Sequence, residues 1–256
     1  MIKFYVIILV TTMLISCEST EHQSFKDKQL TYRRVKIAYQ EKDNQLRNLF
    51  EKQGYKYPPQ NIYIRIFKDE QILEVWTKTN TNATYKKVCN YEFCASSGQL
   101  GPKRQEGDLQ IPEGFYYIDR FNPNSNFFLS LGINYPNESD KILGVKGNLG
   151  GDIFIHGGCA TVGCIPITDD KIKELYWLAV EAKSNGQEKI PVHIFPTKLD
   201  NISLNRLKNR FQNDELLIQF WSNLKIGHDW SVEYGTIPKI TVDKQGVYHF
   251  SEQQTP

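Results

Sequence analysis

One short segment of this chain gathers the side chains that could do thiol chemistry. His156, Cys159 and Cys164 lie within nine residues, and glycines lie between them. A nucleophilic thiol needs a base near the sulfur, and glycine lets the backbone turn sharply beside it. The residue types and their spacing therefore indicate a cysteine nucleophile assisted by a histidine.

The residues on either side of this segment predict the elements that must position it. The run 152–155 reads as a short buried strand. After the cysteines, Thr168, Asp169 and Asp170 precede apolar residues at helical spacing, which predicts a capped helix. The reactive segment is therefore expected on a strand–loop–helix turn, where side chains are exposed yet firmly held.

The remaining pattern predicts an α+β fold with a mainly-β core flanked by N- and C-terminal helices. Polar segments at 96–110 and 134–151 are expected to be loops. Strands are predicted at 61–67, 71–77, 86–95, 114–118, 127–131, 152–155 and 191–196, helices at 31–54, 171–184, 203–209 and 214–224, and short strands within 231–250.

The N-terminus reads as a targeting segment. Lys3 precedes an apolar run over 4–13 that is too short to span a bilayer comfortably, as in a secretory signal peptide. Leu14-Ile-Ser-Cys17 resembles the lipobox of bacterial lipoproteins, whose cysteine is lipidated. We predict a signal peptide over 1–16, lipidation of Cys17 and a polar tether over 17–30; the alternative is an ordinary secretory signal with a chance cysteine.

The length and the net charge of the chain limit the classes of fold and function that it can have. Removing 16 of 256 residues leaves 240, enough for one sizeable core. We expect a single domain over 31–256, with its core at about 60–197 and an extension over 198–256. The formal net charge is +2 and no long basic run occurs, which argues against nucleic acid as a partner.

Four cysteines follow Cys17, and their pairing is open from the sequence. Cys89 and Cys94 are either bridged to each other or two free buried thiols. A bridge between Cys159 and Cys164 would disable a nucleophile there. A zinc site of His156, Cys159 and Cys164 is a third reading, but the spacing is irregular and no fourth ligand is evident. No metal or cofactor is therefore predicted.

The central run resembles L,D-transpeptidases of the YkuD fold, specifically their YafK-like branch. That family carries an upstream His-Gly or His-Ser and a downstream Ser/Thr-His-Gly-Cys; here these are His156-Gly157 and Thr161-Val-Gly-Cys164. Val162 replaces the usual histidine, as in the YafK-like branch. Further resemblance covers roughly 31–250 and is carried by 64–68, 94–103, 107–118, 131–137 and 220–225.

The resemblance implies roles for the residues of the central run. Cys164 is the expected nucleophile and His156 its general base. The N–H groups of Gly163 and Cys164 are candidates to face the oxyanion. Gly157 serves the conformation, and its carbonyl is a candidate to orient His156. Cys159 is the rival nucleophile, otherwise packed or redox-sensitive.

One departure affects substrate binding. Most family members place an arginine two residues after the cysteine, whereas this chain has Pro166 there. Another cation must then meet a substrate carboxylate. Lys103 and Arg120 are predicted to bind substrate, with Arg104 and Lys146 as further candidates, although all four could be solvated charges. Thr161 is predicted to contact substrate, or else to hydrogen-bond within the loop.

The resemblance implies a cysteine acyl-transfer enzyme acting on peptidoglycan stem peptides, through a thioester on Cys164. An amine acceptor gives transpeptidation, and water gives hydrolysis, which includes release of wall-attached lipoprotein. The expected location is the cell envelope, lipid-anchored, facing the periplasm and on the outer membrane. A catalytically inactive, lipid-anchored peptidoglycan-binding module is the alternative.

Overall fold

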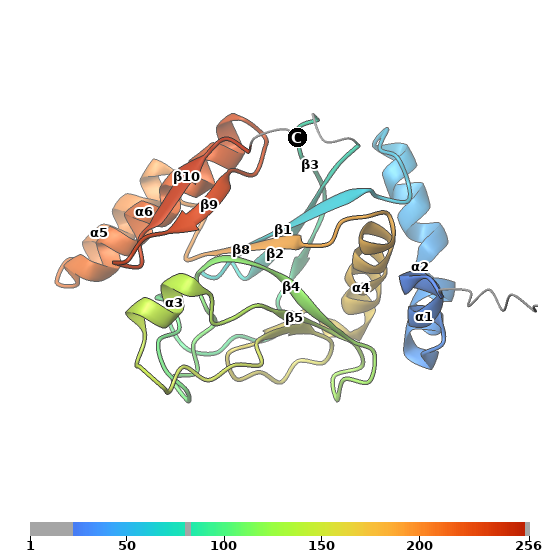
Figure 1. Cartoon of the computed structure of the whole chain (residues 1–256), viewed down its shortest axis with the longest axis horizontal. Helices are drawn as coiled ribbons and strands as arrows, with labels where there is room; N and C mark the ends of the chain where they lie inside the picture. The colour runs from blue at the N-terminus through green and yellow to red at the C-terminus, as the bar shows by residue number, and fades with distance from the viewer. Residues whose placement is uncertain (1–22, 80–82, 254–256) are drawn as a thin grey trace, which may run out of the picture.

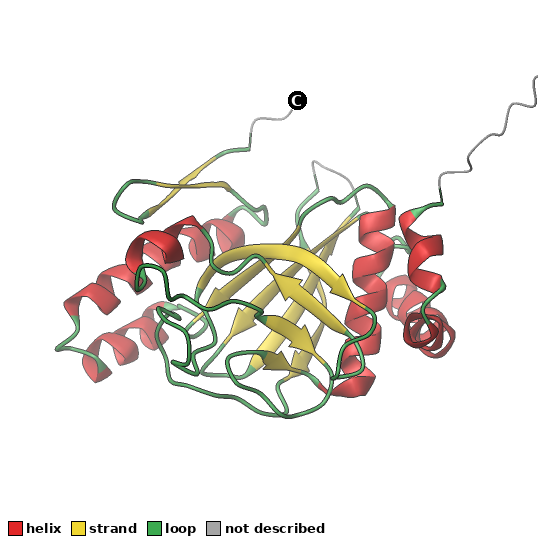
Figure 2. Ribbon diagram, turned by 60° about the horizontal axis from the view of Figure 1, so that its bottom comes forward, coloured by secondary structure: helices red, strands yellow, loops and turns green. Residues whose placement is uncertain are grey.

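The computed structural model describes residues 23–79 and 83–253, so the predicted signal peptide and Cys17 lie outside the described residues (Figure 1). Its centre is a curved eight-stranded sheet with helices at both ends (Figure 2). The strands lie in the order β3-β2-β1-β8-β4-β5-β6-β7. Their bounds are β1 Asn61–Phe67, β2 Ile72–Lys78, β3 Lys86–Glu92, β4 Gly114–Asn122, β5 Ser130–Ile133, β6 Phe154–His156, β7 Ile165–Pro166 and β8 Ile190–Phe195.

Neighbouring strands of the sheet are antiparallel except for two pairs. β1 runs parallel to β8, and β6 runs parallel to β7. β1 is buried at six of its seven positions, because helices and loops cover both of its faces. The middle of the sheet is thus buried on both faces, and the short pair β6–β7 lies at one edge of the sheet.

Three helices form a layer at one side of the sheet, α1 (Phe25–Leu30), α2 (Arg33–Lys52) and α4 (Thr168–Ser184) (Figure 1). α4 buries ten of its 17 residues because it lies between the sheet and α2. Its Trp177 is fully buried, and the indole N–H donates to Asp43 of α2 over 2.9 Å. This layer and the sheet form the larger hydrophobic core.

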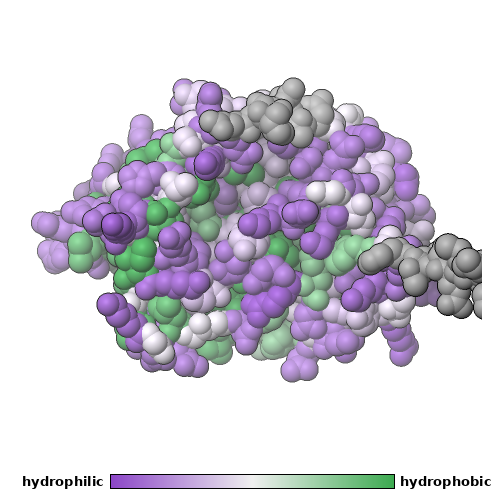
Figure 3. Space-filling view, viewed as in Figure 1, coloured by the Kyte–Doolittle hydropathy of each residue, from purple (hydrophilic) through white to green (hydrophobic). Residues whose placement is uncertain are grey.

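The C-terminal extension forms a second, smaller core. It comprises α5 (Asn201–Arg210), α6 (Glu215–Glu233) and a hairpin of β9 (Lys239–Val242) and β10 (Tyr248–Ser251). Trp221 of α6 packs with Phe115 and Phe195 of the sheet. Hydrophobic residues are also exposed at this end of the molecule (Figure 3), Leu216 among them at 78% exposure.

None of the helices in the described part of the chain, residues 23–79 and 83–253, has the length and the apolar character needed to cross a membrane.

The two edges of the sheet meet at Cys94. β3 and β7 are the edge strands, and the backbone N–H of Cys94, just beyond β3, donates to the carbonyl of Pro166 in β7 over 3.0 Å. A disulfide joins Cys94 to Cys159 at the same place. We call this junction the seam. It closes the curved sheet beside the segment that carries the reactive residues.

The disulfide corrects both readings that the sequence left open for Cys89 and Cys94. Cys89 lies within β3, half-buried, and its thiol donates to the Tyr91 hydroxyl over 3.4 Å. Cys94 lies past the strand end, where its backbone bond to β7 brings it beside Cys159. Sequence proximity therefore gave the wrong partner for Cys94, because the strand carries the two cysteines to different places.

Two segments for which no helix or strand was predicted contain short helices. Part of the predicted tether forms α1, where Ser24 caps the helix and Phe25 packs edge-on against Phe121 with ring centroids 5.1 Å apart. The predicted loop 134–151 contains α3 (Glu138–Leu143), which Asn137 and Asp140 close with a capping box. Both helices are six residues long, too short to show a clear apolar period.

Several other elements differ from their predicted bounds; β3 ends at Glu92, β4 continues to Asn122, β6 is Phe154–His156 and α4 begins at Thr168. The strand predicted at 127–131 begins only at Ser130, because Phe128 adopts a left-handed backbone with φ 67° and turns the chain. The second C-terminal helix, predicted to end at 224, continues to Glu233. His228 in this added part is buried against the rings of Phe67 and Phe195.

Candidate active site

The register of β6 and β7 brings His156 and Cys164 to the same edge of the sheet. His156 pairs with Pro166, and Ile155 pairs with Ile165. Cys164 lies two residues before Pro166. Cys164 directly precedes β7, so the imidazole at the end of β6 and the thiol lie at the same edge of the sheet, offset by two residues in the register.

The His156 ring is held with one nitrogen free to accept a proton. The side chain is 1% exposed and stacks on Phe127 with ring centroids 4.3 Å apart. Its Nδ1 contacts the Gly157 carbonyl oxygen, which can only accept, so Nδ1 carries the proton. Nε2 is buried and has no hydrogen-bond partner among the described residues. Burial lowers the pKa of the ring, which is therefore neutral at pH 7.

The Cys164 thiol is half-buried and mostly protonated at neutral pH. Its Sγ lies 3.6 Å from the carbonyl oxygen of Asp152. Burial raises the thiol pKa, and the Phe154 N–H and the Lys103 ammonium only partly offset this effect. A base must therefore remove the proton during any reaction. In the described chain no hydrogen bond joins the thiol to His156, a contact that often forms only when substrate binds.

Glycines allow the loop between these two residues to follow its path. A Cβ on Gly157 would collide with the Asp169 carboxylate and the Phe127 carbonyl. Gly163 has φ +83°, a backbone conformation that favours glycine, and a Cβ there would lie 3.0 Å from the Gln110 carbonyl oxygen. Both glycines are therefore required by the close packing of the loop.

The two backbone N–H groups predicted to face the oxyanion are both occupied. The Gly163 N–H donates to the Ser97 hydroxyl over 2.7 Å, and the Cys164 N–H donates to the Thr161 hydroxyl over 3.0 Å. The Thr161 hydroxyl in turn donates to the Cys164 carbonyl over 2.8 Å. Thr161 thus holds the backbone of the predicted nucleophile. An oxyanion at this place would have to displace the two hydroxyls.

Ser97 is a site residue that the sequence reasoning missed. Its hydroxyl accepts from Gly163, 66 positions away, and donates to the Leu109 carbonyl over 3.0 Å. The only available signal was its place in the run 94–103, which carries part of the family resemblance. Nothing in that run indicates contact with the reactive loop.

Cys159 is removed as a rival nucleophile and as a zinc ligand by its disulfide to Cys94. A sulfur in a disulfide is neither a free thiolate nor a metal-binding thiolate. Elsewhere in the described ranges, no group of three or more histidine, cysteine, aspartate or glutamate side chains is arranged to hold a metal ion.

The amino-acid sequence of the central part of the chain matches a known family of catalytic domains. Residues 61–194 match the L,D-transpeptidase catalytic domain YkuD, a range that includes the β6–β7 pair and the reactive loop. This match spans more than half of the 256 residues.

The chain belongs to the YkuD family. It is 32% identical over 183 residues to the protein named "Putative L,D-transpeptidase YafK" from Escherichia coli K12, covering 71% of this chain and 70% of that protein. The same values hold for the protein of that name from Escherichia coli O157:H7.

Two solved structures are similar at a lower level. The helical cell shape determining protein Pgp2 from Campylobacter jejuni matches with a TM-score of 0.41 and 22% identity, covering 72% of this chain and 73% of that one. Bd1075 of Bdellovibrio bacteriovorus matches with a TM-score of 0.40 and 21% identity, covering 65% and 58%. The family assignment therefore rests on the sequence matches.

A small cavity of this YkuD domain is lined by Lys103 and by Val162, which lies two residues before Cys164; Cys164 itself is not among the lining residues. The cavity measures about 130 Å³ and has Glu106, Ile153 and Val162 among its other lining residues. Lys103 is 6% exposed; its ammonium donates to Asp108 over 2.6 Å and to the Gln105 carbonyl over 2.7 Å. Val162, at the position of the usual family histidine, is 70% exposed.

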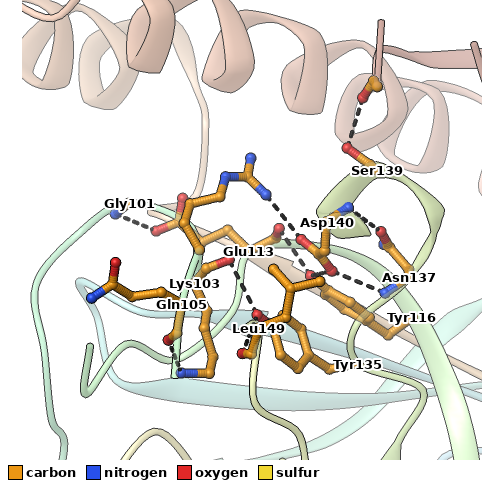
Figure 4. Close-up of polar contacts among 12 residues, drawn as sticks. Gly101, Lys103, Gln105, Glu113, Tyr116, Tyr135, Asn137, Ser139, Asp140 and Leu149 are labelled. Atoms are coloured by element: carbon orange, nitrogen blue, oxygen red, sulfur yellow. Dashed lines mark hydrogen bonds and ion pairs between the residues drawn. The ribbon is translucent and has the colours of Figure 1, made fainter. Parts of the chain in front are cut away.

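A polar network fixes the loop that carries Lys103 (Figure 4). Glu113 accepts from the Gly101 backbone over 2.8 Å and from the Trp221 indole over 2.7 Å, and it pairs with the buried Lys68 over 2.9 Å. Asp140 of α3 accepts from the Tyr116 hydroxyl over 2.8 Å. Trp221 of the C-terminal extension therefore helps to hold Glu113 and, through Glu113, the loop that carries Lys103.

The other predicted cations lie in different surroundings. Arg120 packs over Phe154 and pairs with Asp152 over 2.5 Å, so it lies next to the residue whose carbonyl contacts the thiol. Arg104 pairs with Asp140 over 3.0 Å. Lys146 lies exposed on the loop that follows α3. Of the four, only Lys103 lines the small cavity that Val162 of the reactive loop also lines.

A larger cavity lies away from the thiol. It measures about 770 Å³ and is formed by α6, the turn of the β9–β10 hairpin and the backbone around Gly101. None of its lining residues comes from the segment between His156 and Cys164. The larger cavity and the predicted reactive residues therefore lie in different parts of the fold.

Proposed function

We propose that this chain is a cysteine acyl-transfer enzyme acting on peptidoglycan stem peptides. The observation that carries the proposal is the placement of His156 at the end of β6 and of Cys164 directly before the neighbouring β7, with Nε2 of the ring unpartnered among the described residues and Nδ1 held by Gly157. Membership of the YkuD family supports the same chemistry.

The reaction follows from these two groups. Sγ of Cys164 attacks the carbonyl carbon at the L-centre of a diaminopimelate residue, while Nε2 of His156 takes the thiol proton. The tetrahedral intermediate collapses, the C–N bond breaks and the imidazolium returns the proton to the leaving amine. A thioester remains on Cys164. An amine then gives a crosslink, whereas water gives hydrolysis, including release of a wall-attached lipoprotein.

Lys103 is the cation we assign to a substrate carboxylate. It lines the small cavity together with Glu106 and with Val162 of the reactive loop, so the cavity offers one positive and one negative side chain. The free end of diaminopimelate carries a carboxylate and an ammonium, which match this pair. The ammonium is already paired with Asp108 over 2.6 Å, so a substrate carboxylate would have to share or displace this ion pair.

Muropeptides incubated with purified protein test the proposal. We expect new dimers for transfer, or shortened and released species for hydrolysis. Cys164→Ala should lower product formation at least about 10³-fold, while Cys89→Ala, which changes the other free thiol, should not. Equal product formation by Cys164→Ala and wild type would refute the proposed nucleophile.

A lipid-anchored binding module without catalysis is the second candidate. The raised pKa of the Cys164 thiol and the occupied N–H groups of Gly163 and Cys164 favour it. Val162 and Pro166, where most of the family has histidine and arginine, agree with it. A binder would retain muropeptides in a pull-down with Cys164→Ala and would form no thioester detectable by mass spectrometry.

We also propose that Cys17 carries lipid and holds the domain at the periplasmic side of the outer membrane. The support is the sequence alone, the lipobox-like run that ends at Cys17 after a short apolar segment. Acyl chains add about 0.8 kcal/mol for each buried methylene. Cys17→Ala should move the protein from the membrane fraction to the soluble fraction, and unchanged fractionation would contradict lipidation.

A further inference from the structure

The Cys94–Cys159 disulfide lies in an unusual place for a purely structural bond. Both half-cystines are exposed, and Cys159 lies in the loop between His156 and Cys164. The bond connects this loop to the segment that follows β3. It therefore joins the reactive loop to the opposite edge of the sheet.

The segment 94–97 holds the reactive loop at two separate points. At one point Cys94 is bonded to Cys159, and its Sγ lies 3.1 Å from the Gly158 carbonyl oxygen. At the other, Ser97 accepts the Gly163 N–H over 2.7 Å. Because the second contact is directly before Cys164, a shift of this segment would also move the nucleophile.

Few contacts would replace the disulfide if it opened. The loop keeps the bond from the Gly158 N–H to Asp169 over 2.8 Å and the bonds within the loop from Thr161. The Cys94 N–H retains its single backbone bond to Pro166. Hydrogen bonds exposed to water are individually weak, so the covalent bond dominates at the seam.

We propose that the Cys94–Cys159 disulfide positions Cys164, and that its reduction by a dithiol lowers the activity of the site. The catalytic consequence rests on the proposed function. Exposed disulfides are the labile ones that serve regulation. Both half-cystines are exposed residues, whereas Cys89 is half-buried and burial raises its thiol pKa to about 11.

The redox step balances with an external dithiol as reductant. Its thiolate attacks one sulfur of the disulfide, forms a mixed disulfide and releases the other cysteine. The second thiol of the reductant then displaces the remaining cysteine. Cys94 and Cys159 together gain two electrons and two protons, and the dithiol becomes a disulfide.

The test compares full-length wild type, oxidised or reduced with dithiothreitol, with the variants Cys94→Ser/Cys159→Ser and Cys89→Ser. Three properties are measured after the reductant has been removed: muropeptide turnover, the pH dependence of Cys164 alkylation by iodoacetamide, and the thermal midpoint. Peptide mapping by mass spectrometry assigns each alkylated cysteine.

We expect turnover to fall about tenfold or more in reduced wild type and in the double variant, because small displacements of a reacting group cost up to about 10²-fold in rate. The alkylation profile of Cys164 should shift in pH in both samples. Dithiothreitol should not affect turnover of the double variant, and Cys89→Ser should behave like wild type in every measurement.

Two results would overturn the proposal. The first is unchanged turnover when mapping shows Cys94 and Cys159 fully reduced. The second is a lower thermal midpoint with the turnover and the Cys164 alkylation profile both unchanged, since that describes a merely structural bond. A shifted alkylation profile in a protein with no turnover in any form would support the positioning role and refute the proposed reaction instead.

Discussion

The reactive loop and the helix that follows it are neighbours in the chain, but different forces hold them. The loop 157–164 is glycine-rich, and its Cys159 and Val162 are exposed. One disulfide and a few side-chain-to-backbone hydrogen bonds keep it in place. α4, in contrast, buries ten of its 17 residues between the sheet and α2.

This difference separates residues that should mainly affect the reaction rate from residues that should mainly affect the free energy of unfolding. Each polar contact of the loop contributes roughly 0.5–1.5 kcal/mol, whereas a large buried side chain of α4 contributes several times more. Substitutions in the loop should therefore change reaction rates more than folding. Substitutions in α4 should do the opposite.

The largest effect expected on the loop side is that of His156→Gln. The variant lacks the proton acceptor, so turnover of muropeptides should fall about 10²–10⁴-fold. Its thermal midpoint should stay near that of wild type. His249→Gln, on the exposed β10, is the matched control and should keep wild-type turnover. Full activity of His156→Gln would remove the assigned base.

The largest effect expected on the α4 side is that of Trp177→Ala. The side chain is fully buried and its indole N–H donates to Asp43, so the free energy of unfolding should fall by about 3–5 kcal/mol. Turnover per folded molecule should be retained at temperatures where the variant is folded. Trp230→Ala, at a half-buried position of α6, should cost less in denaturant unfolding. Equal losses would mean that burial in α4 is not the main source of stability.

The pH dependence of turnover should show where the two reacting groups titrate. Burial lowers the His156 pKa, so the ring stays neutral and able to accept a proton below its ordinary pKa of about 6.5. On the acid side of the pH profile, kcat/KM falls as His156 becomes protonated. The midpoint of this fall should therefore lie below pH 6.5.

The pKa of the Cys164 thiol should be shifted in the opposite direction, above its ordinary value. Burial raises the Cys164 pKa, so alkylation by iodoacetamide should reach half its maximum rate above the ordinary thiol pKa of about 8.5. An alkylation midpoint below this value would indicate a thiolate already paired with an imidazolium, and would contradict the neutral pair inferred from the structure.

The smallest expected effect is that of Ser97→Ala. The variant leaves the Gly163 N–H without its partner, at a cost of about 1 kcal/mol in loop positioning, which corresponds to roughly fivefold in turnover. Ser96→Ala, at the exposed adjacent position, is the control. Faster turnover in Ser97→Ala would show instead that the serine competes with the oxyanion for this N–H.

Long periodic elements were predictable from the sequence. Of the apolar residues that predicted the helix 31–54, Val35, Ala38, Leu46 and Phe50 lie on the buried face of α2, which runs from Arg33 to Lys52, whereas Tyr39 is exposed. Strand β1 was predicted with its observed bounds. These elements are predictable because one helix turn or one strand repeat decides which side chains are buried.

Contacts between distant segments were not predictable. Ser97 meets Gly163, and Cys94 bonds Cys159, only because the curved sheet brings its two edge strands together. The alternation of apolar residues specifies a strand but not its neighbour. For this reason the cysteine pairing and the restraints on the loop were missed.

By itself, the sequence determined that a histidine and two cysteines lie in one short glycine-rich segment beside a buried strand, and that this segment resembles a YkuD site. Those properties are local, since residue types and short spacings define them. Only the tertiary structure decided that Cys159 is bonded while Cys164 is free, and that Nε2 of His156 is buried without a hydrogen-bond partner among the described residues. Both outcomes depend on strand register and on the meeting of β3 with β7, which arise from packing across the whole sheet.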